Sequence, residues 1–155
     1  MSSGLRSEIK QTKPFTSLEQ EAQLNIERTA AVLGHAFAEA LKPYGVTPTQ
    51  YNALRILRGA GKEGLCRNEV RDRLIAQVPD VTRLLDRLEE IGLIERERST
   101  TDRRLVGTRI TTRGNALLRT LDEPIARVHK QHLGHMTNKQ LRALNELLTL
   151  ARQGV

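Results

Sequence analysis

The sequence predicts a mainly α-helical fold with one small β-hairpin. From Leu18 onward, apolar residues recur at spacings of three and four, which is the period of amphipathic helices. Capping and turn residues interrupt this pattern at several points, so we expect several separate helices. Only residues 94–110 change to alternating charged and β-branched residues around a polar turn, which indicates two strands.

Length and composition favour a single domain with an anionic partner. The chain has 155 residues, with 25 Lys and Arg against 18 Asp and Glu, and a formal charge of +7. Charge alone fits nucleic acid, an acidic membrane surface or simple solubility. No apolar stretch approaches the roughly 20 residues that cross a bilayer. The first residues lack the apolar core of a signal peptide, so we expect a cytoplasmic protein without a membrane partner.

The N-terminal part divides into an arm and a long helix. Residues 1–16 are polar and without pattern, and we expect a flexible arm there. Residues 17–155 are then a single domain. Its first helix, within 17–46, carries one apolar stripe formed by Ile26, Ala30, Leu33, Phe37 and Leu41. A helix of about seven turns is too long to pack on a small domain, so we expect it to contact a partner chain.

Shorter helices follow. Thr47 to Gln50 has the pattern of a capping box with proline at the first helical position, so a helix begins at Pro48. Gly59 and Gly61 break its apolar pattern. Cys66 to Glu69 repeats the box with cysteine as a structural cap. The next helix, residues 79–91, begins with Pro79 at a first helical position and ends at Gly92.

The C-terminal part contains the hairpin and two more helices. Residues 94–110 form the hairpin, after which Thr111 or Thr112 caps a long helix. Pro124 predicts a kink in that helix rather than its end. Thr137 to Gln140 is another capping box and starts the last helix, which has an apolar face of leucines.

Two helices joined by a turn and followed by a charged hairpin form a winged helix-turn-helix, here over residues 47–111. The runs EVRDRL, VTRLLDRLEEIGLIERERSTTDRR and RITTRGNALL resemble the MarR family, and the resemblance covers roughly residues 20–152. It implies a homodimer held by N- and C-terminal dimerisation helices, 17–46 and 112–155. It also implies a transcription regulator, most often a repressor, that binds operator DNA and is often released by small aromatic ligands.

The predicted recognition helix, 79–91, enters the major groove. Arg83 lies near its start on the polar face, within reach of guanine, although a phosphate contact or a solvated side chain remains an alternative. Asp80 either favours the helix dipole or touches a base, and Thr82 is the other early polar position. Arg67 and Asn68, at the start of the preceding helix, suit a phosphate, with plain capping as the alternative.

The hairpin, or wing, is the basic element and lies at the minor groove. Residues 94–113 have a net charge of +3, whereas residues 79–90 have a net charge of −2, so the wing supplies affinity and the helix selection. The resemblance implies that Arg103 enters the minor groove, with Asp102 and Arg104 bracing the turn. Gln77 stands where the family often has an acid that holds the second wing arginine, and Asp80 is the nearest substitute. The predicted DNA-binding set is Arg67, Asn68, Gln77, Pro79, Asp80, Thr82, Arg83, Arg87, Arg103 and Arg104, with Asp102 as wing brace.

Other candidate sites are weaker. His129, His132 and His135 are three residues apart, but no cysteine is adjacent and Gly134 separates the last, so we expect neither metal nor cofactor. No nucleophile, base and orienting acid form a recognisable set, and we expect no enzyme. Phe37, Tyr51 and His129 could line a pocket for a small aromatic acid. The alternative function is a winged-helix module that binds protein, against which the basic wing argues.

Overall fold

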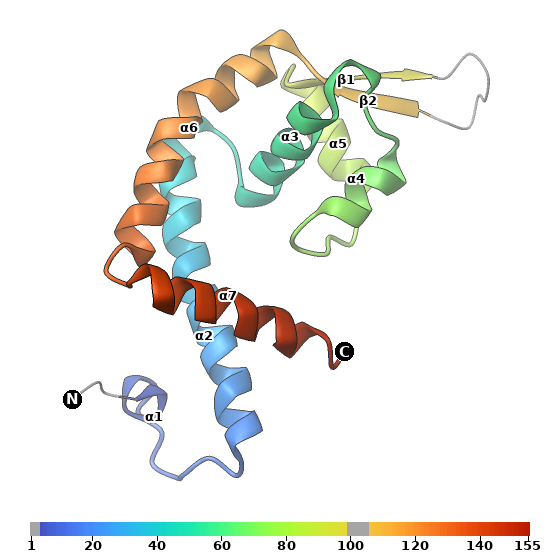
Figure 1. The fold of residues 1–155 in the computed structure, drawn as a ribbon. Helices are drawn as coiled ribbons and strands as arrows, with labels where there is room; N and C mark the ends of the chain where they lie inside the picture. The colour runs from blue at the N-terminus through green and yellow to red at the C-terminus, as the bar shows by residue number, and fades with distance from the viewer. Residues whose placement is uncertain (1–3, 99–105) are drawn as a thin grey trace. The chain divides into compact units, whose positions relative to one another are not determined.

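The computed structural model describes residues 4–98 and 106–155, and it is mainly helical with one two-stranded antiparallel sheet, as predicted (Figure 1). The helices are α1 (Leu5–Glu8), α2 (Leu18–Leu41), α3 (Pro48–Ala60), α4 (Arg67–Arg73), α5 (Val81–Glu90), α6 (Thr112–Leu133) and α7 (Asn138–Arg152). The strands are β1 (Ile94–Arg98) and β2 (Val106–Ile110), and two short 3-10 turns cover Lys42–Tyr44 and Gly61–Glu63. None of the helices described is long and apolar enough to cross a membrane.

The chain forms two compact units, residues 1–39 and 40–155. In the first unit, the one-turn helix α1 lies within residues 1–16, where Leu5 is buried and Arg6 Nε donates to Gln11 O at 3.2 Å. Helix α2 begins at Leu18, where Ser17 Oγ accepts from the backbone N of Gln20 at 3.1 Å. The flexible arm and the single domain from residue 17 stay predictions.

The second unit begins with α3, whose start follows the predicted capping box. Gln50 N donates to Thr47 Oγ1 at 3.2 Å, and Thr47 N donates to Gln50 Oε1 at 3.0 Å. The helix runs through Gly59, where we predicted a break, and stops at Gly61, whose φ of 67° is left-handed. Glycine inside a helix costs only about 1 kcal/mol, which burial of the opposite face offsets.

The core of this unit lies between α3, α4, α5, the base of the sheet and the first half of α6. Each element contributes side chains that are at most 5% exposed, namely Ala53, Leu54, Leu57, Val70, Leu85, Leu88, Leu93, Ile94, Leu118 and Leu121. Because every one of these elements has a polar opposite face, their amphipathic patterns fix which faces remain at the surface.

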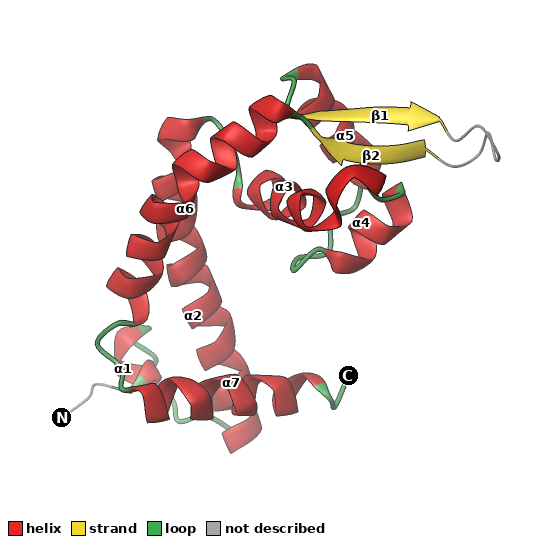
Figure 2. Ribbon diagram, turned by 45° about the horizontal axis from the view of Figure 1, so that its top comes forward, coloured by secondary structure: helices red, strands yellow, loops and turns green. Residues whose placement is uncertain are grey.

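The wing pairs Ile94 with Ile110 at its base and Arg98 with Val106 at its outer end (Figure 2). Leu65 adds one bridge to the free edge of β2, where its N donates to Thr108 O at 2.9 Å and its O accepts from Thr108 N at 2.7 Å. Gly64 has a φ of 67°, and a Cβ there would lie 2.4 Å from Thr108 O, so this approach requires glycine.

Thr111 joins the wing to α6. Its hydroxyl donates to Gly92 O at 2.7 Å and accepts from Gly114 N at 3.1 Å. Helix α6 continues through Pro124, and Figures 1 and 2 show it bending along its length. Helix α7 begins at the predicted Thr137 capping box. It contains no buried residue, and its Leu147 and Leu150 are each 63% exposed.

Candidate nucleic-acid interface

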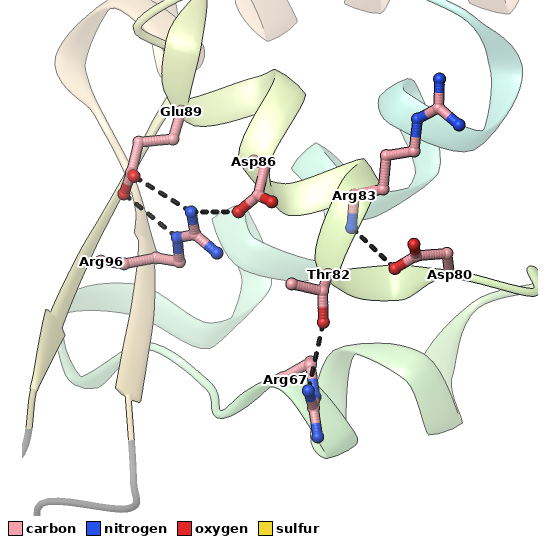
Figure 3. A network of polar contacts seen from close by, with 7 residues as sticks. All are labelled: Arg67, Asp80, Thr82, Arg83, Asp86, Glu89 and Arg96. Carbon is pink, nitrogen blue, oxygen red and sulfur yellow. Dashed lines mark hydrogen bonds and ion pairs between the residues drawn. The ribbon is translucent and has the colours of Figure 1, made fainter.

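The start of α5 is built around Asp80. The Asp80 carboxylate accepts from the backbone N of Arg83 at 2.9 Å and caps the helix (Figure 3). Pro79, which we predicted at the first helical position, therefore precedes the cap. Aspartate binds free amide groups at a helix start better than any alternative nearby, which places the start two residues later than predicted. Of the two roles expected for Asp80, the structure shows the one at the helix end.

Helix α5 has two distinct faces. Val81, Leu85 and Leu88 are buried, whereas the opposite side forms an open groove lined by Arg83, Asp86, Arg87 and Glu90. Arg87 Nη1 pairs with Glu90 Oε2 at 3.2 Å. The Arg83 guanidinium extends into solvent and forms no ion pair with the residues described (Figure 3). It is therefore open to an anionic or hydrogen-bonding ligand.

Helix α4 and the turn after it lie beside this face. Arg67 Nη1 donates to Thr82 Oγ1 at 3.1 Å, so two predicted DNA-binding residues on different helices are in contact (Figure 3). Asn68 and Gln77 are exposed, as a DNA contact would require. The Glu69 carboxylate accepts from Cys66 N at 2.8 Å, which lowers the pKa of that carboxyl and completes the predicted start of α4.

The turn between the two helices is held from α3. Asn52 Oδ1 accepts from Ile75 N at 2.9 Å. Sequence reasoning missed this bond because the two residues are 23 positions apart and no local pattern marks Asn52.

Arg96 of β1 reaches across to α5 and binds two of its acids. Arg96 Nη2 lies 2.5 Å from Asp86 Oδ1 and 3.1 Å from Glu89 Oε1, and Nε lies 3.2 Å from Glu89 Oε2 (Figure 3). These bonds lower the pKa of Glu89 and raise that of the guanidinium. The sequence indicated only that Arg96 adds charge to the wing; in the structure this charge neutralises α5.

A second wing arginine is also paired. Arg109 Nη2 lies 2.6 Å from Glu97 Oε2, and Arg109 Nε lies 3.7 Å from Glu95 Oε1. Arg98 and Arg113 form no ion pair with any residue that the structure describes. Asp102, Arg103 and Arg104, the predicted tip, lie outside the described residues. Among the wing residues described, Arg98 is thus the cation that remains available.

Two predictions away from this face concern a ligand pocket and a metal. Phe37 belongs to the first unit, whereas Tyr51 and His129 belong to the second, and the pocket stays a prediction. Burial raises the pKa of the Tyr51 phenol, and Arg55 lies 5.9 Å from its ring centroid. Over residues 4–98 and 106–155, no three His, Cys, Asp or Glu side chains are grouped to hold a metal.

One ion pair connects the helix-turn-helix to α6 and was not predicted. Arg58 of α3 binds Asp122 of α6 through both carboxylate oxygens, at 3.0 Å each. The two residues are 64 positions apart, so no local spacing could have paired them. A bidentate arginine contact fixes geometry better than a single bond does.

Comparisons with known proteins agree with this architecture. The family profile described as MarR family matches residues 44–105. An uncharacterised HTH-type transcriptional regulator of Bacillus subtilis, YkoM, is 30% identical over 109 residues, which cover 67% of this chain and 69% of that protein. The B. subtilis HTH-type transcriptional repressor MdtR is 26% identical over 129 residues, which cover 83% of this chain and 82% of that protein.

Solved structures give the same result. A MarR transcription factor from Planctomyces limnophilus is 38% identical with a TM-score of 0.69, covering 88% of this chain and 99% of that one. The S. aureus MepR-DNA complex has a TM-score of 0.79 at 20% identity, and the match covers 92% of this chain and 100% of that one. At this identity the likeness concerns the fold alone.

Proposed function

This chain belongs to the MarR family of winged helix-turn-helix transcription regulators, and we propose that it binds a pseudo-palindromic operator as a homodimeric repressor. One observation carries the proposal: the polar face of α5 is exposed at its capped start with the Arg83 guanidinium extended into solvent, while the wing is bound to the same helix through Arg96. MepR, a MarR variant and Sco3205, which share the fold, have been solved with DNA.

We place α5 in the major groove and the wing, 94–110, at the minor groove. Arg83 then reads a guanine, and Thr82, Arg87 and Gln77 lie beside the same strand. Arg67 and Asn68 contact phosphates from the start of α4. Arg103 and Arg104 act at the wing tip, with Asp102 as brace.

The dimer would be formed by residues 17–46 and 112–155. Support comes from α2, where Ile26 and Val32 are 40% and 50% exposed, and from α7, where Leu147 and Leu150 are exposed. Exposed apolar side chains on the surface of a small chain support such an interface. A small aromatic ligand near Phe37, Tyr51 and His129 would release the DNA.

Footprinting on DNA that flanks the protein's own gene tests the proposal. We expect protection of a two-fold site whose halves are roughly one turn, about 34 Å, apart. Inserting about five base pairs between the halves rotates one of them away and should abolish tight binding. Failure to bind any duplex at low salt would refute the proposal and favour the protein-binding module.

The roles of Arg83 and Arg103 separate in a second experiment. Arg83→Ala should weaken binding to the operator by about 1–3 kcal/mol and binding to random duplex by little, since a base contact is lost. Arg103→Ala should weaken binding to both duplexes and reduce the slope of the logarithm of the binding constant against the logarithm of salt concentration by about one per subunit. Arg127→Ala, which removes an exposed arginine paired with Glu123 on α6, is the control. Equal losses on both duplexes for Arg83→Ala would contradict base reading.

A further inference from the structure

Helix α5 contains two arginine–acid pairs with the same spacing but different outcomes. Arg87 and Glu90 are three residues apart and form an ion pair at 3.2 Å. Arg83 and Asp86 are also three residues apart and line the same groove, yet Arg83 points away from Asp86 (Figure 3). Because arginine and an acid at this spacing are neighbours on a helix surface, an unoccupied Asp86 would attract Arg83.

Asp86 is occupied from another element. Arg96 of β1 binds it at 2.5 Å and is fixed further by two bonds to Glu89, at 3.1 and 3.2 Å. The Arg96 side chain is 22% exposed and the Asp86 side chain is 49% exposed, so Arg96 is the more buried of the two. The cation that neutralises Asp86 therefore comes from the wing and lies outside the Arg83 groove.

We propose that Arg96 is a positioning residue for DNA recognition, which keeps Arg83 unpaired and available to a base by holding Asp86. The inference rests on the proposed function, because Arg83 is the residue assigned there to base reading. Without Arg96, Asp86 would pair with Arg83 along the helix, and a carboxylate would face the phosphates of the duplex. Glu89 also holds Arg96, but it lies six residues beyond Arg83, on a different face of the helix, and so cannot pair with Arg83.

The test measures Kd on the footprinted operator fragment and on a random duplex of the same length. Arg96→Met should bind the operator about three- to tenfold more weakly, as expected when an ion pair competes with a contact and an acid is left uncompensated. Arg109→Met is the matched control, since it removes the same charge from the wing but leaves Asp86 bound to Arg96. The operator loss should exceed that of the control, whereas the random duplex should lose no more than the control does.

Two double variants with the same net charge identify the cause. Arg96→Met with Asp86→Asn should recover most of the operator affinity, because nothing then captures Arg83. Arg96→Met with Glu89→Gln should not recover it. Equal recovery in both would show a general effect of charge, and recovery in neither would show that Arg96 only braces the wing; either result overturns the proposal.

Thermal unfolding accompanies each variant. If Arg96→Met does not fold, the two second substitutions are made on Arg96→Gln, which also removes the charge, and the same difference between them is expected. A wild-type protein that binds no duplex would contradict the proposed function itself. A wild type that binds its operator, with Arg96→Met no weaker than Arg109→Met, would contradict only the role of Arg96.

Discussion

The arginines on the face formed by α5 and the wing divide into two groups. Arg87, Arg96 and Arg109 are held by acids, whereas Arg83 and Arg98 form no ion pair with the described residues. An ion pair engages part of a guanidinium, most fully where the side chain is also buried as at Arg96, whereas an exposed and unpaired guanidinium retains all five donors. Counting residues gives the net charge of a segment, but only the partners show which arginines can bind DNA.

Asp80 provides a test at this scale. Asp80→Ala should lower the free energy of unfolding by about 1 kcal/mol, because the bond to the Arg83 amide is lost, while asparagine caps nearly as well. Asp80→Asn should therefore keep wild-type stability in denaturant unfolding. If Asp80 also read a base, Asp80→Asn would change the operator preference despite normal stability; we expect no such change.

At the scale of elements, the wing and α6 approach each other closely where they join. A Cβ at Gly114 would lie 2.3 Å from Leu93 O and 2.7 Å from Ile110 Cγ1. Thr111 N donates to Leu93 O at 3.1 Å, so backbone groups of both elements meet here. The base of the wing and the start of α6 are thus packed without space for a side chain.

Gly114→Ala should therefore destabilise the protein by about 1–3 kcal/mol, since the backbone of Leu93 must move. Gly59→Ala is the matched comparison, because Gly59 lies inside α3 with nothing within 4 Å of an added Cβ. The free energy of unfolding of Gly59→Ala should rise by about 0.5–1 kcal/mol, because the substitution removes the backbone flexibility of glycine in a helix. Both are measured by urea unfolding, and equal effects would contradict the close approach at Gly114.

The contact between α5 and β1 should be sensitive to acid. Arg96 holds the pKa of Glu89 below its ordinary value of 4.5. A lowered pKa in the folded state means that the stabilisation is complete above pH 4.5 and is lost as the pH falls through the folded-state value. The difference in Tm between wild type and Glu89→Gln should thus be largest near neutral pH and shrink below pH 4.5. A constant difference would show that the charge of Glu89 is unimportant.

Local signals predicted the helix starts correctly at Pro48 and after Thr137, since a cap and its partner are three residues apart, and of the two caps predicted for α6 the structure has Thr111. Errors arose where two local signals competed, as at Pro79 beside Asp80. The pairs Arg58–Asp122 and Arg96–Asp86 were missed because they depend on how elements pack, which no spacing records. The candidate face could be predicted from sequence, but not which of its side chains are already engaged.

At the scale of the whole molecule, α7 contributes no buried side chain to the core of the chain. Its leucines recur on one side, yet none of its residues is buried. Isolated helices of about 15 residues are marginal in water, so most helical stability has to come from packing. A second copy of the chain is the partner that the proposed function supplies.

Light scattering at micromolar concentration should give about twice the chain mass of 17.4 kDa. Leu147→Lys, which places a charge on the exposed apolar side of α7, should shift the mass toward the monomer, whereas Lys139→Ala near the start of α7 should not. Unfolding temperature should rise with concentration for wild type. A monomer that still binds the operator tightly would contradict this assembly.

The bonds at Thr111 and the close packing at Gly114 tie the first half of α6 to the residues that join α5 to the wing. The helix has 22 residues, about 33 Å of length, and its start is tied to Gly92 and Leu93. Pro124 lacks the amide that would complete the ladder at mid-length, so bending is least costly there. If the far end of α6 were displaced, bending at Pro124 would therefore absorb part of the movement before it reached α5 and the wing.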